Sequence, residues 1–223
     1  MTIRTMHHRA LAPIMVALFA FGLLFSCASK PAKDPDAVSG MSFVPLSESS
    51  ITDELLPVEN PGRVLVVYFS QGTAARRVAE DLAALTGAHL EAIVELKKRG
   101  TGFFGFMGAG MDASFKAATP IAVPMMDPSK YDAVYVVSPV WSWNLCPPVR
   151  TWLRTFQGVL PRVAYVTVSG DTDPEKIVKA MAKEGGREPF ASAGFAEKDF
   201  SPENRPAYLA RIGTLVDPLR EAR

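Results

Sequence analysis

Continuous apolar runs alternate along the chain with segments of helical periodicity. The clearest run, residues 64–69, is β-branched and aromatic throughout, and a short polar loop joins it to apolar residues spaced as on one face of a helix. Such a run predicts a central parallel strand that leads into a crossover helix. Further strands are predicted over 88–95, 131–138, 162–168 and 188–195, and a closing helix over 205–220.

This alternation predicts the fold class. Strands separated by helices favour an α/β protein, a three-layer sandwich in which right-handed crossovers join a five-stranded parallel sheet. In open sheets of this kind, ligands bind at the carboxyl ends of the strands. The loops after Phe69, Ser138 and Val168 are therefore expected to meet in one crevice, as a consequence of the fold.

The N-terminus has the layout of a secretory signal peptide. Arginines and histidines precede an apolar run over 11–25, which is too short to cross a bilayer core of roughly 30 Å comfortably. The run ends in Leu24-Phe25-Ser26-Cys27, which resembles the lipobox of bacterial lipoproteins. That resemblance implies that Cys27 carries lipid, becomes the mature N-terminus and holds the protein at a membrane of the bacterial cell envelope. An ordinary cleavable signal and an uncleaved anchor are the alternatives.

The residues that follow are rich in Pro, Ser, Lys, Asp and Glu up to Gly62. A flexible coil of that length has ends about 30 Å apart, enough to hold a small domain clear of a bilayer. We therefore expect a signal peptide over 1–26, the lipid-attachment cysteine and a tether over 27–62, and the folded domain over 63–223.

Composition narrows the functions that the domain can have. The chain has 223 residues, 48% of them hydrophobic, and a formal net charge of +1. One globular core accounts for these values, and the lack of a basic stripe argues against nucleic acid as a partner. Of the two cysteines, Cys146 has no partner if Cys27 carries lipid, so neither a disulfide framework nor a cysteine zinc site is expected.

The loop after the first strand is a candidate phosphate cradle, because a helix N-terminus offers unpaired N–H groups and a partial positive charge. The order of strand, polar loop and Val78-Ala79-Glu80 resembles the flavodoxin-like family, whose loop reads Ser-x-Thr-Gly-x-Thr. Gly72 stands at the first threonine of that pattern, Thr73 at the glycine and Ala75 at the last threonine; only Ser70 is kept.

A second stretch carries a closer resemblance. The third strand runs from Tyr131 into Ser138-Pro139-Val140-Trp141, and Pro147-Pro148-Val149-Arg150 then begins a helix. The same residue types at the same spacing occur in the flavodoxin-like family. The resemblance implies the strand order 2-1-3-4-5 and a bound FMN. It also implies cofactor-binding residues in three loops, namely Ser70, Gln71, Gly72, Thr73, Ala74 and Ala75, then Pro139, Val140, Trp141, Ser142 and Trp143, then Ser169, Gly170 and Asp171.

Structural roles compete with some of these assignments. Trp141 and Trp143 are placed to stack on a planar ligand, but either could instead pack in the core. Asp171 and Asp173 border the flavin in the implied site, although helix capping is the commoner role of such residues. Arg76 or Arg77 could reach a phosphate, or both could be solvated.

No other catalytic arrangement can be assembled from the sequence. His89 stands alone in a predicted strand, and Ser70 lacks a Gly-x-Ser-x-Gly setting. The glycines between Gly100 and Gly110 lack the Lys-Ser/Thr of a Walker loop. The segment 97–119 is expected to form a helix over the sheet, with a flap over a ligand or an apolar patch for a partner or the membrane as alternatives.

Redox chemistry in such a domain would have to come from a bound cofactor. The expected function is that of a lipid-anchored FMN-binding protein that carries electrons or reduces a small acceptor such as a quinone. The alternative is a flavodoxin-like domain that has lost flavin and serves as a binding or scaffolding module at the envelope.

Overall fold

The computed structural model describes residues 50–99, 103–170 and 172–221, with only the backbone of 103–106. Cys27, the apolar run before it and the tether up to residue 49 lie outside the described residues, as does Asp171. None of the helices in the described ranges is long and apolar enough to cross a membrane.

The sheet confirms the predicted class and strand order. Parallel strands lie in the order β2-β1-β3-β5-β6, and a short β4 pairs antiparallel with β3. Without β4 this is the order 2-1-3-4-5. The bounds are β1 (Val64–Tyr68), β2 (His89–Ala92), β3 (Ala133–Trp141), β4 (Asn144–Leu145), β5 (Arg162–Ser169) and β6 (Ala191–Ala196).

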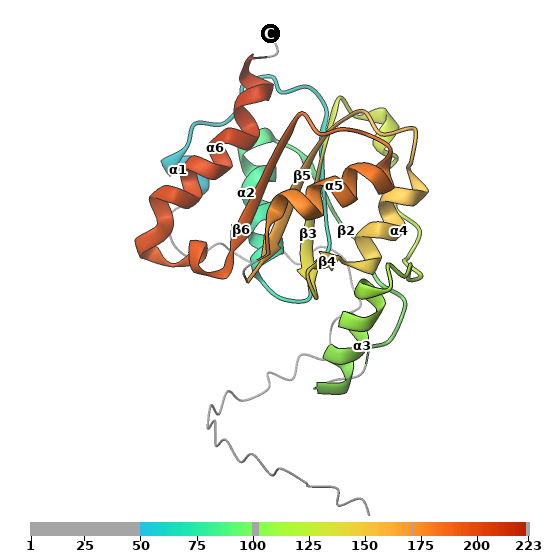
Figure 1. Cartoon of the computed structure of the whole chain (residues 1–223). Helices are drawn as coiled ribbons and strands as arrows, with labels where there is room; N and C mark the ends of the chain where they lie inside the picture. The colour runs from blue at the N-terminus through green and yellow to red at the C-terminus, as the bar shows by residue number, and fades with distance from the viewer. Residues whose placement is uncertain (1–49, 100–102, 171, 222–223) are drawn as a thin grey trace, which may run out of the picture. The chain divides into compact units, whose positions relative to one another are not determined.

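Helices cover both faces of the sheet (Figure 1). They are α1 (Ile51–Glu54), α2 (Ala74–Thr86), α3 (Phe103–Ser114), α4 (Pro147–Thr155), α5 (Pro174–Gly185) and α6 (Arg205–Glu221), with 3-10 turns η1 (Pro128–Lys130), η2 (Glu197–Phe200) and η3 (Pro202–Asn204). One core lies between the sheet and α1, α2 and α6, the other between the sheet and α4 and α5. The buried residues of both cores lie between Ile51 and Leu219.

Alternation along the central strands explains the two layers. Val64 and Val66 of β1 belong to the first core, whereas Leu65 and Val67 belong to the second. All four are nearly or fully buried. A strand buried on both faces must be apolar at every position, which is why this run has no polar residue.

The domain begins earlier than the predicted boundary at Arg63. Ile51 and Val58 are buried in the first core, at 1% and 6% exposure. The N–H of Val58 donates to the Leu85 carbonyl at 2.7 Å, and Arg205 forms an ion pair with Glu54. The assignment of residues 50–62 to a tether was therefore wrong. Their polar, proline-rich composition gave no sign that Ile51 and Val58 are core residues.

A buried carboxyl group links α2 to α6. The Tyr208 hydroxyl donates to Asp81 Oδ2 at 2.6 Å, and Asp81 is 4% exposed. Burial raises the pKa of Asp81 above its ordinary value, although the hydrogen bond from Tyr208 and the charges of Arg205 and Arg77 act in the opposite direction. Glu80 adds to the increase. The folded state therefore holds this proton more tightly than the unfolded chain does.

Asp81→Asn is expected to stabilise the domain most at neutral pH. A raised pKa contributes stability that is fully present below the unfolded pKa and is lost as pH rises through the folded pKa. Asparagine can still accept the Tyr208 hydrogen bond but never ionises. Its advantage in urea unfolding should therefore shrink as pH falls from about 7 to about 4, near the ordinary pKa of aspartate. A difference between the two proteins that stays constant over this range would contradict the assignment.

Candidate functional site

Three loops leave the carboxyl edge of neighbouring strands. The N–H of Phe69, which follows β1, donates to the Val137 carbonyl of β3 at 3.2 Å. Further along β3, Pro139 stands opposite Val168 of β5. The rings of Phe69 and Trp141 meet edge to face at a centroid distance of 5.6 Å. The loops that begin at Ser70, Pro139 and Ser169 thus share one edge of the sheet.

The first loop is held by its own serine. The Ser70 hydroxyl donates to the Gly72 carbonyl at 2.5 Å and lies 3.3 Å from the Gly72 N–H, which donates to it. Gln71, Gly72 and Thr73 are exposed, and Ala74 is half-buried. A Cβ added at Gly72 would meet nothing within 4 Å. The loop therefore has open space on its outer side, where a ligand group could lie.

The helix that follows has an uncapped N-terminus. Thr73, the N-cap residue of α2, makes no side-chain hydrogen bond to the first turn, and that turn holds no acidic residue. By contrast, Asp173 caps α5 by accepting from the Glu175 N–H at 2.9 Å. Since neither the Thr73 side chain nor an acidic residue of the first turn meets the first N–H groups of α2, they can receive an anion.

The neighbouring arginines do not face this N-terminus as a pair. Arg76 Nε donates to Glu80 Oε1 at 2.7 Å, and this bond raises the pKa of the arginine above its ordinary value. Arg77 is exposed. The guanidinium of Arg76 is thus already paired, while Arg77 remains exposed.

The second loop forms a tight hairpin that the sequence did not predict. Trp141 pairs with Asn144 across a two-residue turn in which Ser142 and Trp143 have φ of 45° and 58°. Such turns are usually Asn-Gly, because both positions require a left-handed backbone. Holding two ordinary residues there costs about 1–3 kcal/mol each. Without the usual turn residues, no local signal marked β4.

The two tryptophans of this hairpin have different surroundings. Trp141 is half-buried against Phe69, and the Arg99 guanidinium lies 4.8 Å from the centre of its ring. Arg99 in turn pairs with Glu95 at 2.6 Å. Trp143 is 69% exposed at the tip of the turn. Trp141 is thus already packed, whereas Trp143 can contact a ligand. The remaining residues assigned to this loop, Pro139, Val140 and Ser142, are half-buried.

In the third loop, serine and aspartate hold the turn. Ser169 Oγ accepts from the Thr172 N–H at 3.1 Å. Asp173 has the capping role that was the alternative to ligand binding. Gly170 is exposed, and a Cβ there would meet nothing within 4 Å.

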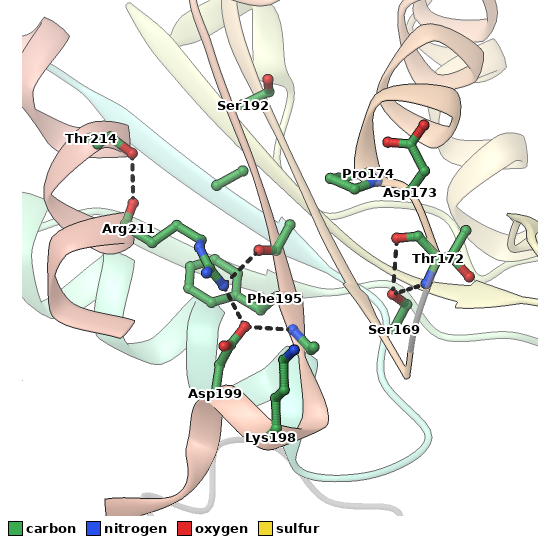
Figure 2. Close-up of a pocket in the computed structure, with 13 residues that line it drawn as sticks. Ser169, Thr172, Asp173, Pro174, Ser192, Phe195, Lys198, Asp199, Arg211 and Thr214 are labelled. Carbon is green, nitrogen blue, oxygen red and sulfur yellow. Dashed lines mark hydrogen bonds and ion pairs between the residues drawn. The ribbon is translucent and has the colours of Figure 1, made fainter. Parts of the chain in front are cut away.

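A hollow of about 740 Å³ lies along the edge strand β6, and side chains from both sides of this strand line it (Figure 2). It shares Ser169, Thr172 and Asp173 with the third loop but includes no residue of the first two. Its most buried charge, Asp199, accepts from the Ala196 N–H at 2.7 Å and pairs with Arg211. The Asp199 and Arg211 side chains of this hollow thus already bind each other, and the candidate site is the sheet edge at which the three loops begin.

Comparisons with known proteins bear on the fold. No protein-family model matches the chain, and no curated protein sequence matches it. The structure is similar to that of a flavoprotein from Lactobacillus acidophilus in complex with FMN, with a TM-score of 0.53 and 18% identity over 62% of this chain and 95% of that one. A protein from Bacteroides uniformis assigned as a flavoprotein is similar with a TM-score of 0.51 and 21% identity, over 67% of this chain and 98% of that one. The fold is flavodoxin-like.

In the flavodoxin-like fold, the candidate crevice lies where the strand order reverses. The two strands that follow β1 in the chain lie on opposite sides of it in the sheet, β2 on one side and β3 on the other. Ligands collect at such a reversal, and flavodoxin itself is an established example. The uncapped helix α2 and the hairpin with Trp143 border this point.

Among the described residues of the three loops, no side chain is an obvious catalytic group. Cys146 is fully buried, and burial raises the pKa of its thiol to about 11, so it stays protonated at neutral pH. In the described part of the chain, no group of three or more His, Cys, Asp or Glu could hold a metal ion. Any electron transfer at these loops therefore needs a cofactor.

Proposed function

We propose that this chain is a lipid-anchored flavodoxin-like protein that binds FMN at the three loops and carries electrons or reduces a small acceptor such as a quinone. The observation that carries the proposal is the uncapped N-terminus of α2 at the point where the strand order reverses. The flavoprotein from Lactobacillus acidophilus, similar in fold, was solved with FMN.

The residues at the crevice fit this cofactor. The N–H groups at the start of α2 and the Thr73 hydroxyl would hold the phosphate, and the Ser70 hydroxyl would have to leave the Gly72 carbonyl to join them. Trp143, which is exposed on its hairpin, would cover the flavin ring, and the loop from Ser169 would border its other side. Bound FMN would supply the electron-transfer chemistry, while the protein fixes its position and excludes water.

The alternative function also has an observation in its favour. Three of the four diagnostic positions of the first loop are altered, and the Ser70 hydroxyl is engaged within its own loop. A domain that has lost flavin and serves as a scaffold at the envelope fits both facts. The visible spectrum of the chain from Ala28 onward, with and without added FMN, separates the two. A yellow protein with quenched flavin fluorescence supports flavin binding, and a colourless one that does not perturb added FMN supports the scaffold.

Trp143→Ala is expected to weaken FMN binding by about tenfold or more, since stacking on an aromatic side chain is worth about 1–3 kcal/mol. Trp141→Ala should affect affinity less and stability more, because Trp141 packs on Phe69 and Arg99. Fluorescence titration with FMN, beside thermal unfolding of each variant, measures both effects. If both variants keep full affinity, tryptophan stacking is not part of the site.

Cys27→Ala is expected to block lipidation. The lipobox-like segment implies several acyl groups at this residue, and two or more anchor a protein stably where one does not. The variant expressed in bacteria should accumulate as an unprocessed precursor without lipid label. Normal processing with retention in the membrane fraction would contradict the anchor and favour an ordinary or uncleaved signal.

A further inference from the structure

Exposed large hydrophobic side chains gather in one part of the domain. Of the ten such side chains among the described residues, eight belong to segment 94–125 or to the β3–β4 hairpin. Single exposed apolar residues are normal on protein surfaces, but a concentration of them marks a docking surface.

Helix α3 buries small side chains and exposes large apolar ones, the reverse of a helix that packs on a core. Its small residues, Ala109 and Ala113, are buried at 7% and 0% exposure. Met107, Met111 and Phe115, the last just beyond the helix, recur every four residues and are 45%, 54% and 77% exposed. Because positions four apart lie on the same side of a helix, the three bulky side chains form one stripe.

The β3–β4 hairpin lies against α3 at Gly110. A Cβ at Gly110 would collide with the Ser142 hydroxyl, so α3 touches the hairpin at the residue before Trp143. In Figure 1, α3 lies beside β4 at the end of the sheet. We call the surface formed by Met107, Met111 and Phe115 the α3 face.

The charges around the α3 face are mainly basic. Asp112 is the only ionisable residue within α3, and it pairs with Lys97 at 2.5 Å and Arg99 at 3.0 Å. These bonds lower the pKa of Asp112 below its ordinary value. Lys98 and Lys116, on either side of the helix in the sequence, are exposed. An apolar stripe with exposed lysines before and after it in the sequence suits an anionic lipid surface, where bulky apolar side chains enter the interface and lysines meet the headgroups.

We propose that the α3 face docks the domain on an anionic lipid bilayer. A helix of 12 residues is about 18 Å long, which fits an interfacial helix and not a spanning one. A flexible coil as long as residues 27–50 would have ends about 25–30 Å apart, so a lipid at Cys27 would keep the face within reach of the membrane. Lipid docking favours a lipophilic acceptor, since the α3 face borders the candidate flavin crevice; this last step rests on the proposed function, whereas the docking does not.

Vesicle flotation of the chain from Ala28 onward tests the docking. This chain keeps both cores and lacks the lipid, so any binding comes from the protein surface. With vesicles of equal parts phosphatidylglycerol and phosphatidylethanolamine, the unaltered chain should float, and with pure phosphatidylcholine it should float much less. Met111→Gln with Phe115→Gln should lower the partition coefficient by about tenfold or more, because two large apolar side chains no longer enter the interface.

A matched control uses the two exposed hydrophobic residues elsewhere on the domain. Leu56→Gln with Val159→Gln removes side chains that are 81% and 52% exposed, and it should leave flotation unchanged. Equal flotation of the two double variants, or none by the unaltered chain, would overturn the proposal. So would a dimer in lipid-free buffer that the α3 variant alone dissociates, since a second copy would then cover the face. Equal melting temperatures exclude misfolding, and because the assay contains no FMN, its result is independent of flavin binding.

Discussion

Trp152→Ala is expected to lower the free energy of unfolding by about 3–5 kcal/mol, the usual cost of truncating a buried tryptophan to alanine. Trp152 lies on α4, is 1% exposed and belongs to the second core. Its ring centroid is 4.9 Å from that of Phe156. Loss of the indole would leave a cavity between α4 and the sheet that its neighbours can only partly fill. Urea unfolding measures the change as a lower midpoint at an unaltered slope.

Two control variants sharpen this measurement. Trp143→Ala removes the same side chain from a site that is 69% exposed, so its cost should stay below about 1 kcal/mol. Trp152→Phe should cost much less than Trp152→Ala, because Nε1 of Trp152 is buried without a hydrogen-bond partner and phenylalanine removes this unpaired donor. Similar losses from alanine at positions 143 and 152 would show that α4 does not pack as described.

The sequence predicted the parts of the fold that depend on long apolar runs. The strand that contains Val64–Tyr68 is buried on both sides, so its composition alone identified it as central. The α/β class and the strand order followed from this alternation and from the resemblance to flavodoxin-like proteins. Helix α3 was also expected, although it lies at the end of the sheet beside β4 and not over a sheet face.

Features that depend on single contacts were missed. Nothing in the composition of residues 50–62 marked Ile51 as a core residue, because its burial comes from α1 packing against α2 and α6. The hairpin at Ser142 and Trp143 was not predicted, because its turn lacks the glycine or asparagine that usually marks a two-residue hairpin turn. The pairing of Asp199 with Arg211 joins η2 to α6, a contact that no local pattern encodes.

In the candidate site, too, the sequence predicted what depends on strand order and missed what depends on single contacts. The three loops could be placed at one edge of the sheet, because parallel strands end together. Whether Trp141 or Trp143 stays available for a ligand depends on a neighbour distant in sequence, Arg99, which covers the ring of Trp141. Likewise, the α2 N-terminus is open because Thr73 does not cap it, although threonine is a common capping residue.

The same helix end leads to a prediction of weak FMN binding. Relative to the flavodoxin-like pattern, the loop lacks hydroxyls at Gly72 and Ala75. Each hydrogen bond to a charged phosphate is worth about 1.5–3 kcal/mol, so losing two weakens binding by roughly 3–6 kcal/mol, or two to four decades in affinity. Arg76 is unsuited to compensate, because its guanidinium is paired with Glu80. We expect FMN to be lost during purification.

Restoring the pattern should reverse this weakness. Gly72→Thr with Thr73→Gly and Ala75→Thr is expected to tighten FMN binding by about tenfold or more, since each threonine adds a donor to the phosphate. Position 72 has open space for a side chain, but Ala75 is only 2% exposed, so unfolding must be measured beside affinity. The matched control places valine at 72 and 75, which adds the same bulk without hydroxyls and should gain nothing. In isothermal titration, nanomolar binding by the unaltered chain would show that the missing hydroxyls are compensated elsewhere, and no binding by any form would favour the scaffold function.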